Sequence, residues 1–180
     1  MIGNDCIDSF YLDELECRKV QRCAGTRIDA SEFNSLGFSD GLFLGNYAPS
    51  LVIDGKYEGY YNFAHAKNLG MDFLIDISKQ SSARTGISSV EVYPRSAGSY
   101  ERYEKMTVEL TNHHTTLPGV PFVCLPADVY NTARVNQLAS SNKPLIFVCN
   151  ASVIATEIKI KINENSGMNI RLLHFSAKWF

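Results

Sequence analysis

The sequence predicts an α/β fold of three layers, in which a mostly parallel central sheet is flanked by helices. Short apolar runs with little polar alternation, at residues 73–77, 120–125 and 145–149, are typical of strands that are buried on both faces of a sheet. Segments with helical spacing lie between such runs. Strands that alternate with helices favour a layered architecture built on a parallel sheet.

The spacing of apolar residues predicts helices between and before these strands. The predicted helices are residues 9–22, 62–69, 100–110 and 129–140. The last of them follows Asp128, whose side chain is a good N-cap. Further short strands are predicted at residues 42–44, 90–93 and 170–175.

Residues 157–175 fit two different structures. Isoleucines at helical spacing favour a helix followed by a strand, which would complete a βαβ unit. Residues 157–162 also alternate strictly between charged and apolar side chains, which is typical of a strand. A terminal β-hairpin with residues 168–175 would then result. The helix is the preferred interpretation, and the hairpin stays open.

The length and net charge of the chain limit its possible domain organisation and partners. A chain of 180 residues suffices for one domain, and we expect residues 39–180 to form it, with residues 1–38 as an N-terminal extension packed on it. The net charge of -2 gives no basic field, so neither nucleic acid nor a membrane is expected as a partner. No apolar run approaches the roughly 20 residues that span a bilayer.

The cysteines favour an intracellular protein. There are five of them, an odd number, and Cys124 and Cys149 lie inside apolar strand-like runs. This pattern favours reduced thiols in the cytoplasm over a disulfide framework. Cys17 and Cys23 have no second pair and no nearby histidine, so zinc is not expected. No metal or other cofactor is predicted.

The run at residues 145–149 ends in a cysteine that is followed by a small polar turn. In α/β proteins, the carboxyl end of a buried strand, before a turn that can start a helix, is where a nucleophile or an anion site is often placed. This position makes Cys149 the candidate nucleophile of the chain.

Four stretches, taken in order, resemble the dual-specificity and other cysteine-based protein phosphatases. They are residues 41–46, 66–77, 119–128 and 143–149, and the resemblance extends to about residue 156. In that family a loop of His-Cys, five residues, Arg and Ser or Thr binds the phosphate, and an aspartic acid protonates the leaving oxygen. The resemblance implies Cys149 as nucleophile and Asp128 as general acid. It implies anion-binding roles for Asn150, Ser152, Thr156 and Arg134.

The chain departs from the family at three defining positions. Ala155 stands in place of the arginine, Val148 in place of the histidine and Ser152 in place of a glycine. The loss of a bidentate arginine typically removes about 3–4 kcal/mol of transition-state stabilisation. The resemblance therefore implies a catalytically impaired, phosphatase-like module that binds a phosphorylated ligand or a protein partner. Arg134 and Arg84 are the candidate substitutes for the lost guanidinium.

Other interpretations stay open. Local context favours Cys149 as an inert buried residue and Asp128 as a plain helix cap. The alternative functions are an active cysteine-dependent phosphatase, a phosphocysteine protein similar to the B components of sugar phosphotransferase systems, and a Rossmann-like interaction protein without an active site. The sequence predicts no oligomeric state.

Overall fold

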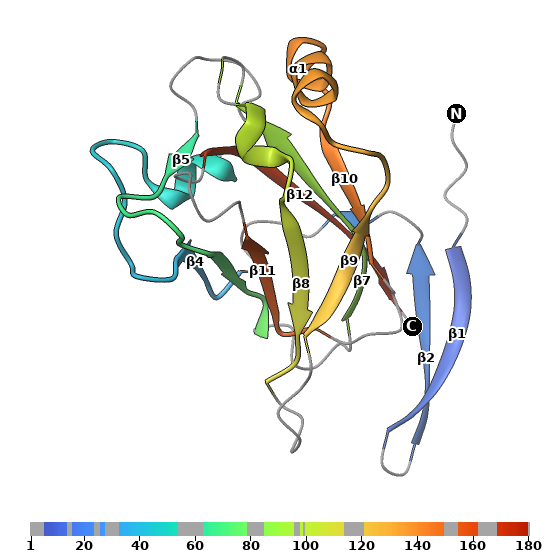
Figure 1. The fold of residues 1–180 in the computed structure, drawn as a ribbon. Coiled ribbons are helices and arrows are strands. Elements are labelled where there is room, and N and C mark those ends of the chain that lie inside the picture. The colour runs from blue at the N-terminus through green and yellow to red at the C-terminus, as the bar shows by residue number, and fades with distance from the viewer. Residues whose placement is uncertain are drawn as a thin grey trace.

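The structure is a computed structural model in which most strands form a single antiparallel β-sandwich (Figure 1). It describes residues 6–13, 16–23, 26–27, 33–53, 63–78, 85–95, 98, 100–113, 121–149, 155–161 and 169–179. For residues 6–27, 85–86 and 169–179 the description is limited to the backbone.

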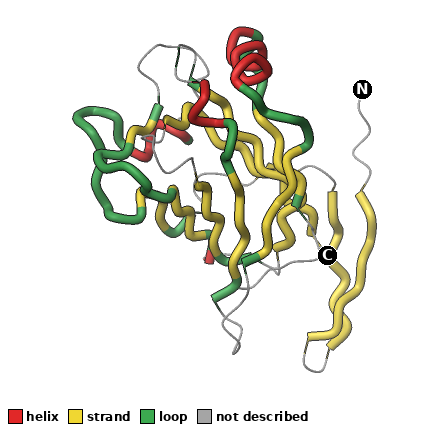
Figure 2. The backbone as a smooth tube through the Cα atoms, viewed as in Figure 1, coloured by secondary structure: helices red, strands yellow, loops and turns green. Residues whose placement is uncertain are grey.

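Strands dominate the described part of the chain, as the tube in Figure 2 shows. They are β1 (Cys6–Asp13), β2 (Glu16–Cys23), β3 (Thr26–Arg27), β4 (Ser35–Phe38), β5 (Ala64–His65), β6 (Phe73–Asp76), β7 (Thr85–Pro94), β8 (Thr107–Thr111), β9 (Phe122–Pro126), β10 (Leu145–Val148), β11 (Glu157–Lys161) and β12 (Asn169–Trp179). The helical elements are the α-helix α1 (Thr132–Ser140) and the 3-10 helices η2 (Pro49–Val52) and η4 (Tyr100–Tyr103).

The strand pairs of the described residues are all antiparallel. Strands β1 and β2 form a hairpin, and the others follow the order β3-β12-β7-β10-β9-β8-β11-β6-β4, with β5 paired to β12. Strand β9 links the two layers, because residues 122–124 pair with β8 whereas residues 125–126 pair with β10. In Figure 1, β8, β11 and β4 belong to one layer and β12, β7 and β10 to the other.

The predicted three-layer α/β fold with a parallel sheet is therefore wrong. The apolar runs are strands, but each turns only one face to the core. In β10, Leu145 and Phe147 are buried, whereas Ile146 is 36% and Val148 52% exposed. Apolar residues on the outer face made a one-sided strand resemble a strand that is buried on both sides.

Three of the four predicted helices are also wrong. Residues 9–13 lie in β1 and residues 16–22 in β2, residues 62–69 include β5, and residues 100–110 contain η4 and most of β8. Only the helix predicted at residues 129–140 is present, as α1. Its N-cap is Asn131 and not Asp128, because the Asn131 side chain accepts a hydrogen bond of 2.9 Å from the Arg134 backbone N–H.

The helix preferred after residue 157 is wrong as well. The alternative correctly predicted two strands there, β11 and β12, but they do not pair with each other as a hairpin. Strand β11 pairs with β6 and β8 in one layer, while β12 pairs with β7, β3 and β5 in the other. The strict alternation in β11 is explained by its position, because Ile158 and Ile160 are fully buried and Lys159 points away from the core.

The core lies between the two layers and is contributed by almost every strand whose side chains are described. Its largest fully buried side chains are Tyr103, Phe73, Phe147, Ile75, Ile87, Leu110, Leu145, Ile158 and Ile160. Strand β4 completes the layer of β8 and β11 by pairing with β6. Strand β3 extends the layer of β12, β7 and β10 by pairing with β12. None of the helices described here has the length and apolar character that crossing a membrane requires.

Candidate functional site

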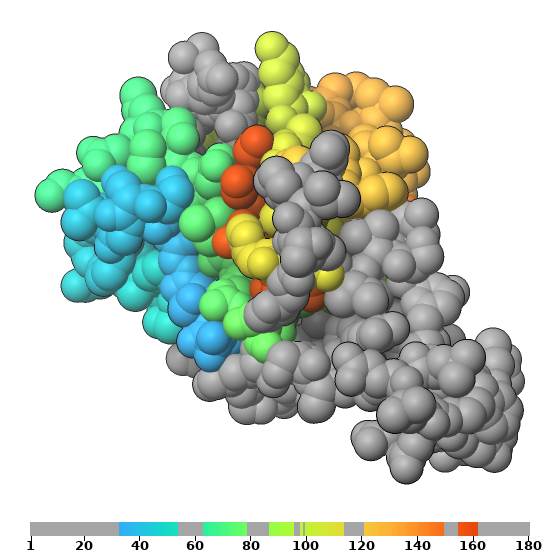
Figure 3. Space-filling view, turned by 90° about the horizontal axis from the view of Figure 1, so that it is seen from below, coloured from blue at the N-terminus to red at the C-terminus, as the bar shows by residue number. Residues whose placement is uncertain are grey.

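Several connections between strands meet at one end of the sandwich. Pro94 at the end of β7 pairs with Ile170 near the start of β12, and His65 of β5 pairs with Asn169. The β4–β6, β7–β8 and β9–β10 connections therefore reach the same end, which we call the loop end. In Figure 1 it is the upper end, where η2, β5, η4 and α1 lie. Figure 3 shows the molecule from below, which is the end opposite the loop end.

Three aromatic rings and a guanidinium gather at the loop end, and we call them the aromatic–arginine cluster. The rings of Tyr47 and Phe63 are stacked, with centroids 4.6 Å apart and an interplanar angle of 14°. The His65 ring lies 6.3 Å from each of them. The Arg95 guanidinium carbon lies 4.9 Å from the centroid of the Phe63 ring, within the range of a cation–π interaction.

Backbone hydrogen bonds hold the cluster in place. The His65 N–H donates to the Tyr47 carbonyl at 3.1 Å, and the Leu44 N–H donates to the His65 carbonyl at 2.9 Å. His65 Nδ1 lies 2.7 Å from the Ala66 carbonyl oxygen. Because a carbonyl oxygen only accepts, Nδ1 carries the proton, and Nε2 of the neutral imidazole is an acceptor.

Tyr103 fixes the backbone of Arg95. Its hydroxyl accepts a hydrogen bond of 3.0 Å from the Arg95 N–H, and only 1% of the residue is exposed. Burial raises the pKa of Tyr103 far above its ordinary value, so the hydroxyl is neutral at every physiological pH. The end of β7 is thereby tied to η4 through a partly buried hydrogen bond.

We expect Tyr103→Phe to lower the free energy of unfolding by about 1–3 kcal/mol, because the substitution removes the acceptor of a partly buried N–H group while leaving the ring in place. Urea denaturation of the variant and the wild type measures this difference. Equal midpoints and slopes for the two proteins would contradict the role given to this hydroxyl.

Two hollows flank residues 127–131 at the loop end. The η4 hollow has a volume of about 440 Å³ and is lined by Tyr103, Glu104, Lys105, Met106, Pro126, Asp128, Val129, Tyr130 and Asn131. The α1 hollow has a volume of about 300 Å³ and is lined by Ala127, Asp128, Tyr130, Arg134, Leu138, Lys143, Pro144 and Ile146. Asp128 and Tyr130 line both of them.

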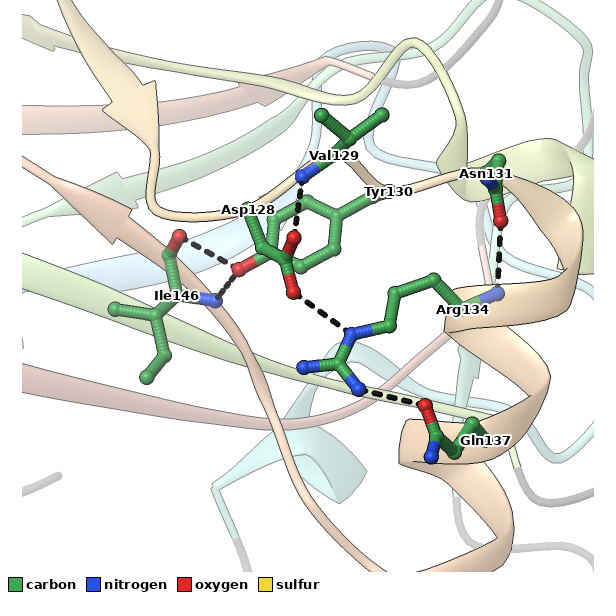
Figure 4. A network of polar contacts seen from close by, with 7 residues as sticks. All are labelled: Asp128, Val129, Tyr130, Asn131, Arg134, Gln137 and Ile146. Carbon is green, nitrogen blue, oxygen red and sulfur yellow. Dashed lines mark hydrogen bonds and ion pairs between the residues drawn. The ribbon is translucent and has the colours of Figure 1, made fainter.

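A polar network organises the wall of the α1 hollow (Figure 4). The Asp128 carboxylate accepts hydrogen bonds of 2.7 Å from Arg134 Nε and from the Val129 N–H. Arg134 Nη1 donates to Gln137 Oε1 at 2.6 Å. The Arg134 side chain first, and the Val129 N–H next, hold the pKa of Asp128 below its ordinary value. Asp128 is therefore a carboxylate at neutral pH.

The structure pairs Cys149, the predicted nucleophile, with Cys124 in a disulfide. Leu125 lies opposite Val148 in the β9–β10 register, so one further step places the two cysteines opposite each other. Their Cα atoms are 4.3 Å apart, as in a pair of residues that exchange no backbone hydrogen bonds. The expectation of reduced thiols is wrong for this pair, and a disulfide sulfur is not a thiolate.

Of the predicted site residues that the structure describes, Asp128 and Arg134 do not lie beside Cys149. Cys149 follows the end of β10 and is buried, whereas the exposed Asp128 and the half-buried Arg134 lie beside the other end of that strand. The lowered pKa of Asp128 is also opposite to what a general acid at neutral pH requires. The Thr156 hydroxyl accepts from the His113 N–H at 2.9 Å and lies 3.3 Å from the Thr111 carbonyl oxygen.

Asn150 and Ser152, which were predicted to bind an anion, lie outside the described residues. Within the described part of the chain, histidine, cysteine, aspartate and glutamate form no group that could hold a metal ion.

Sequence reasoning did not find the aromatic–arginine cluster. Tyr47, Phe63 and Arg95 are far apart in the chain and carry no fixed spacing. The only local signal was the alternation at residues 90–93, which predicted a strand that stops before Arg95. The pairing of β5 with β12, which brings these residues together, involves segments more than a hundred positions apart.

No family model matches the chain, and the search of curated proteins found no match. Solved structures do match. A family 32 carbohydrate-binding module from Clostridium perfringens NanJ, in complex with galactose, has a TM-score of 0.57 at 19% identity, over 84% of this chain and 98% of that chain. A Streptococcus pneumoniae fucose binding module has a TM-score of 0.59 at 14% identity, over 83% and 95%.

A third match is the fucolectin from the serum of striped bass, Morone saxatilis, with a TM-score of 0.59 at 14% identity, over 90% of this chain and 51% of that chain. The chain has the β-sandwich fold of these sugar-binding domains. The resemblance to cysteine-based phosphatases is wrong, because that family was inferred for a parallel α/β sheet and the structure is an antiparallel sandwich. The inferred pseudophosphatase function and its three alternatives lose their basis with it.

Proposed function

We propose that this domain binds carbohydrate and does not catalyse a reaction on it. Structures with the same fold are named for a complex with galactose, for fucose binding and for a complex with Lewis b antigen. The observation that carries the proposal within this chain is the aromatic–arginine cluster at the loop end, where Arg95 lies against Phe63 beside Tyr47 and His65.

The chemistry of the cluster suits a sugar. A saccharide presents hydroxyl groups, which both donate and accept hydrogen bonds, together with an apolar face of C–H groups. The Arg95 guanidinium offers only donors, whereas His65 Nε2 offers an acceptor. Tyr47 and Phe63 supply aromatic surface next to both. A few fixed polar groups beside aromatic side chains are the usual composition of a small-molecule site.

The proposal also accounts for the absence of a suitable acid and nucleophile among the predicted catalytic residues. Asp128 is held as a carboxylate by Arg134, and the Cys149 sulfur is bonded to Cys124. Neither group is in the protonation or redox state that the phosphatase reaction needs. Binding a sugar requires neither state.

The test is to apply the purified chain to a glycan array and then to measure binding of galactose, fucose and the Lewis b oligosaccharide by calorimetry. We expect Arg95→Ala to weaken binding of the preferred sugar by about tenfold to a hundredfold, because hydrogen bonds to a charged group are lost. Arg95→Lys, which keeps the charge and loses the planar fork, should weaken it as well.

Lys159→Ala is the matched control, because it removes a cation from the outer face of β11 and should leave affinity unchanged. Circular dichroism shows whether each variant is folded. The absence of any retained glycan, or equal affinities of the wild type and a folded Arg95→Ala variant, would contradict the proposal.

A further inference from the structure

We propose that the α1 hollow is a second saccharide subsite, selective for a sugar that carries an anionic group, either a carboxylate or a sulfate. This proposal rests on the carbohydrate-binding function proposed above and adds the class of sugar to it. The hollow lies at the same loop end as the aromatic–arginine cluster, but it is built from the β9–β10 connection and α1.

Arg134 is held in one orientation by its neighbours. Asp128 accepts from Nε at 2.7 Å and Gln137 accepts from Nη1 at 2.6 Å, while Asn131 accepts from the backbone N–H of Arg134 at 2.9 Å. A guanidinium has five N–H donors. Asp128 and Gln137 each take one of these donors. The other three, including both on Nη2, have no acceptor among the residues that the structure describes.

The fixed guanidinium therefore presents donors for an additional oxygen ligand. In Figure 4 the Arg134 head group lies between Asp128 and Gln137, away from the helix backbone. Planar pairing with two oxygens of a carboxylate or sulfate is the geometry that arginine forms best. Because Asp128 occupies the Nε side, such an oxyanion would bind through the Nη2 side.

The charges that line the two hollows differ in sign. The α1 hollow is lined by Arg134, Lys143 and a single carboxylate, that of Asp128, which gives a formal charge of +1. The η4 hollow is lined by Glu104, Asp128 and Lys105, which gives a formal charge of -1. An anionic ligand is consequently favoured in the first hollow and disfavoured in the second.

The rest of the wall suits a sugar ring. Leu138, Pro144 and Ile146 supply apolar surface, and Tyr130 supplies an aromatic ring. The Tyr130 hydroxyl donates to the Ile146 carbonyl at 3.0 Å and accepts from the Ile146 N–H at 2.7 Å, which fixes the ring against the start of β10. The volume of about 300 Å³ is at the lower end of the range of about 300–1,000 Å³ for small-molecule sites.

The experiment compares three sugars that differ only at one carbon: galactose, galacturonic acid and galactose 6-sulfate. Binding of each to the full chain is measured by calorimetry at low and at high salt. We expect at least one of the two acidic sugars to bind more tightly than galactose at low salt, with an advantage that shrinks as salt rises. Tight binding of both indicates recognition of charge, and tight binding of one identifies the preferred oxyanion.

Arg134→Ala and Lys143→Ala should each weaken binding of the favoured acidic sugar, the first by about tenfold to a hundredfold. Arg134→Lys should weaken it less, because the charge remains and the fork is lost. Lys105→Ala, which removes a lysine from the η4 hollow, is the matched control and should leave acidic-sugar binding unchanged.

The two proposals fail in different ways. Galactose binding that depends on Arg95, together with acidic sugars that bind no better than galactose, overturns the second subsite alone. An acidic-sugar preference that survives in both folded Arg134→Ala and Lys143→Ala variants overturns it as well. If no sugar binds the chain at all, both proposals are wrong.

Discussion

Removal of the Cys124–Cys149 disulfide is expected to lower the free energy of unfolding by about 3–4 kcal/mol. The two cysteines are 25 positions apart, and a cross-link that closes a loop of this length restricts the unfolded chain by about that amount. Both residues are buried, so we choose Cys124→Ala with Cys149→Ala, which leaves no unpaired polar group in the core. For a chain of this size the melting temperature should fall by roughly 10 °C.

Thermal denaturation with and without a thiol reductant measures the effect. The wild type should lose stability when the Cys124–Cys149 disulfide is reduced, and the double variant should already have lost the stability that this bond contributes. A variant in which Cys6, Cys17 and Cys23 are replaced by serine keeps the Cys124–Cys149 bond and is the control. Equal melting temperatures of the double variant and the non-reduced wild type would refute the expectation.

The position of this bond explains why it should matter for the fold. Cys124 lies in the part of β9 that pairs with β8, opposite Val108, while the next two residues of β9 pair with β10. The bond therefore lies where β9 passes from the layer of β8 to the layer of β10. The disulfide at this position therefore holds the junction between the two layers together in the folded protein. It also restricts the unfolded chain.

The sequence predicted the positions of strands better than their surroundings. Strands were expected and found at residues 73–77, 120–125 and 145–149, and each end lies within two positions of the expected one. What the pattern could not show was that Ile146 and Val148 face outward, because apolar side chains on a surface look the same in a sequence as buried ones. The inference of a parallel sheet followed from that ambiguity.

The helices failed for a related reason. Residues 62–69 contain apolar side chains at helical spacing, but Ala64 and His65 pair with β12, a segment more than a hundred positions later. Tertiary pairing of this kind overrides local propensity. In α1, where local capping by Asn131 and apolar periodicity act together, the prediction of a helix ending near Ser140 was confirmed.

The candidate site was the least predictable part. The cysteine at the end of β10 suggested a nucleophile, since its partner Cys124 lies in a separate apolar run and an odd number of cysteines disfavours a disulfide framework. Asp128 and Arg134 were singled out for a phosphate site, and the structure places them together, six positions apart, on the wall of the α1 hollow. Their proximity was accessible from the sequence, but the hollow beside them was not.

Phe147→Ala should lower the free energy of unfolding by about 3–5 kcal/mol, which is the usual cost of truncating a fully buried aromatic residue. Phe147 is 1% exposed and lies opposite Val90 of β7 and Pro126 of β9. Its ring centroid is 5.8 Å from that of Tyr130, so the cavity would open beneath the ring that lines both hollows. Urea denaturation measures the loss of stability.

The neighbouring residue supplies a control that tests the fold itself. Val148 belongs to the same strand but is 52% exposed, so Val148→Ala should change stability by less than about 1 kcal/mol. In a parallel sheet covered by helices on both faces, truncation of either residue would leave a cavity and both would be costly. A large loss for Phe147→Ala beside a small one for Val148→Ala is therefore expected only for a sandwich in which β10 turns one face to the core, and similar losses for the two variants would contradict that architecture.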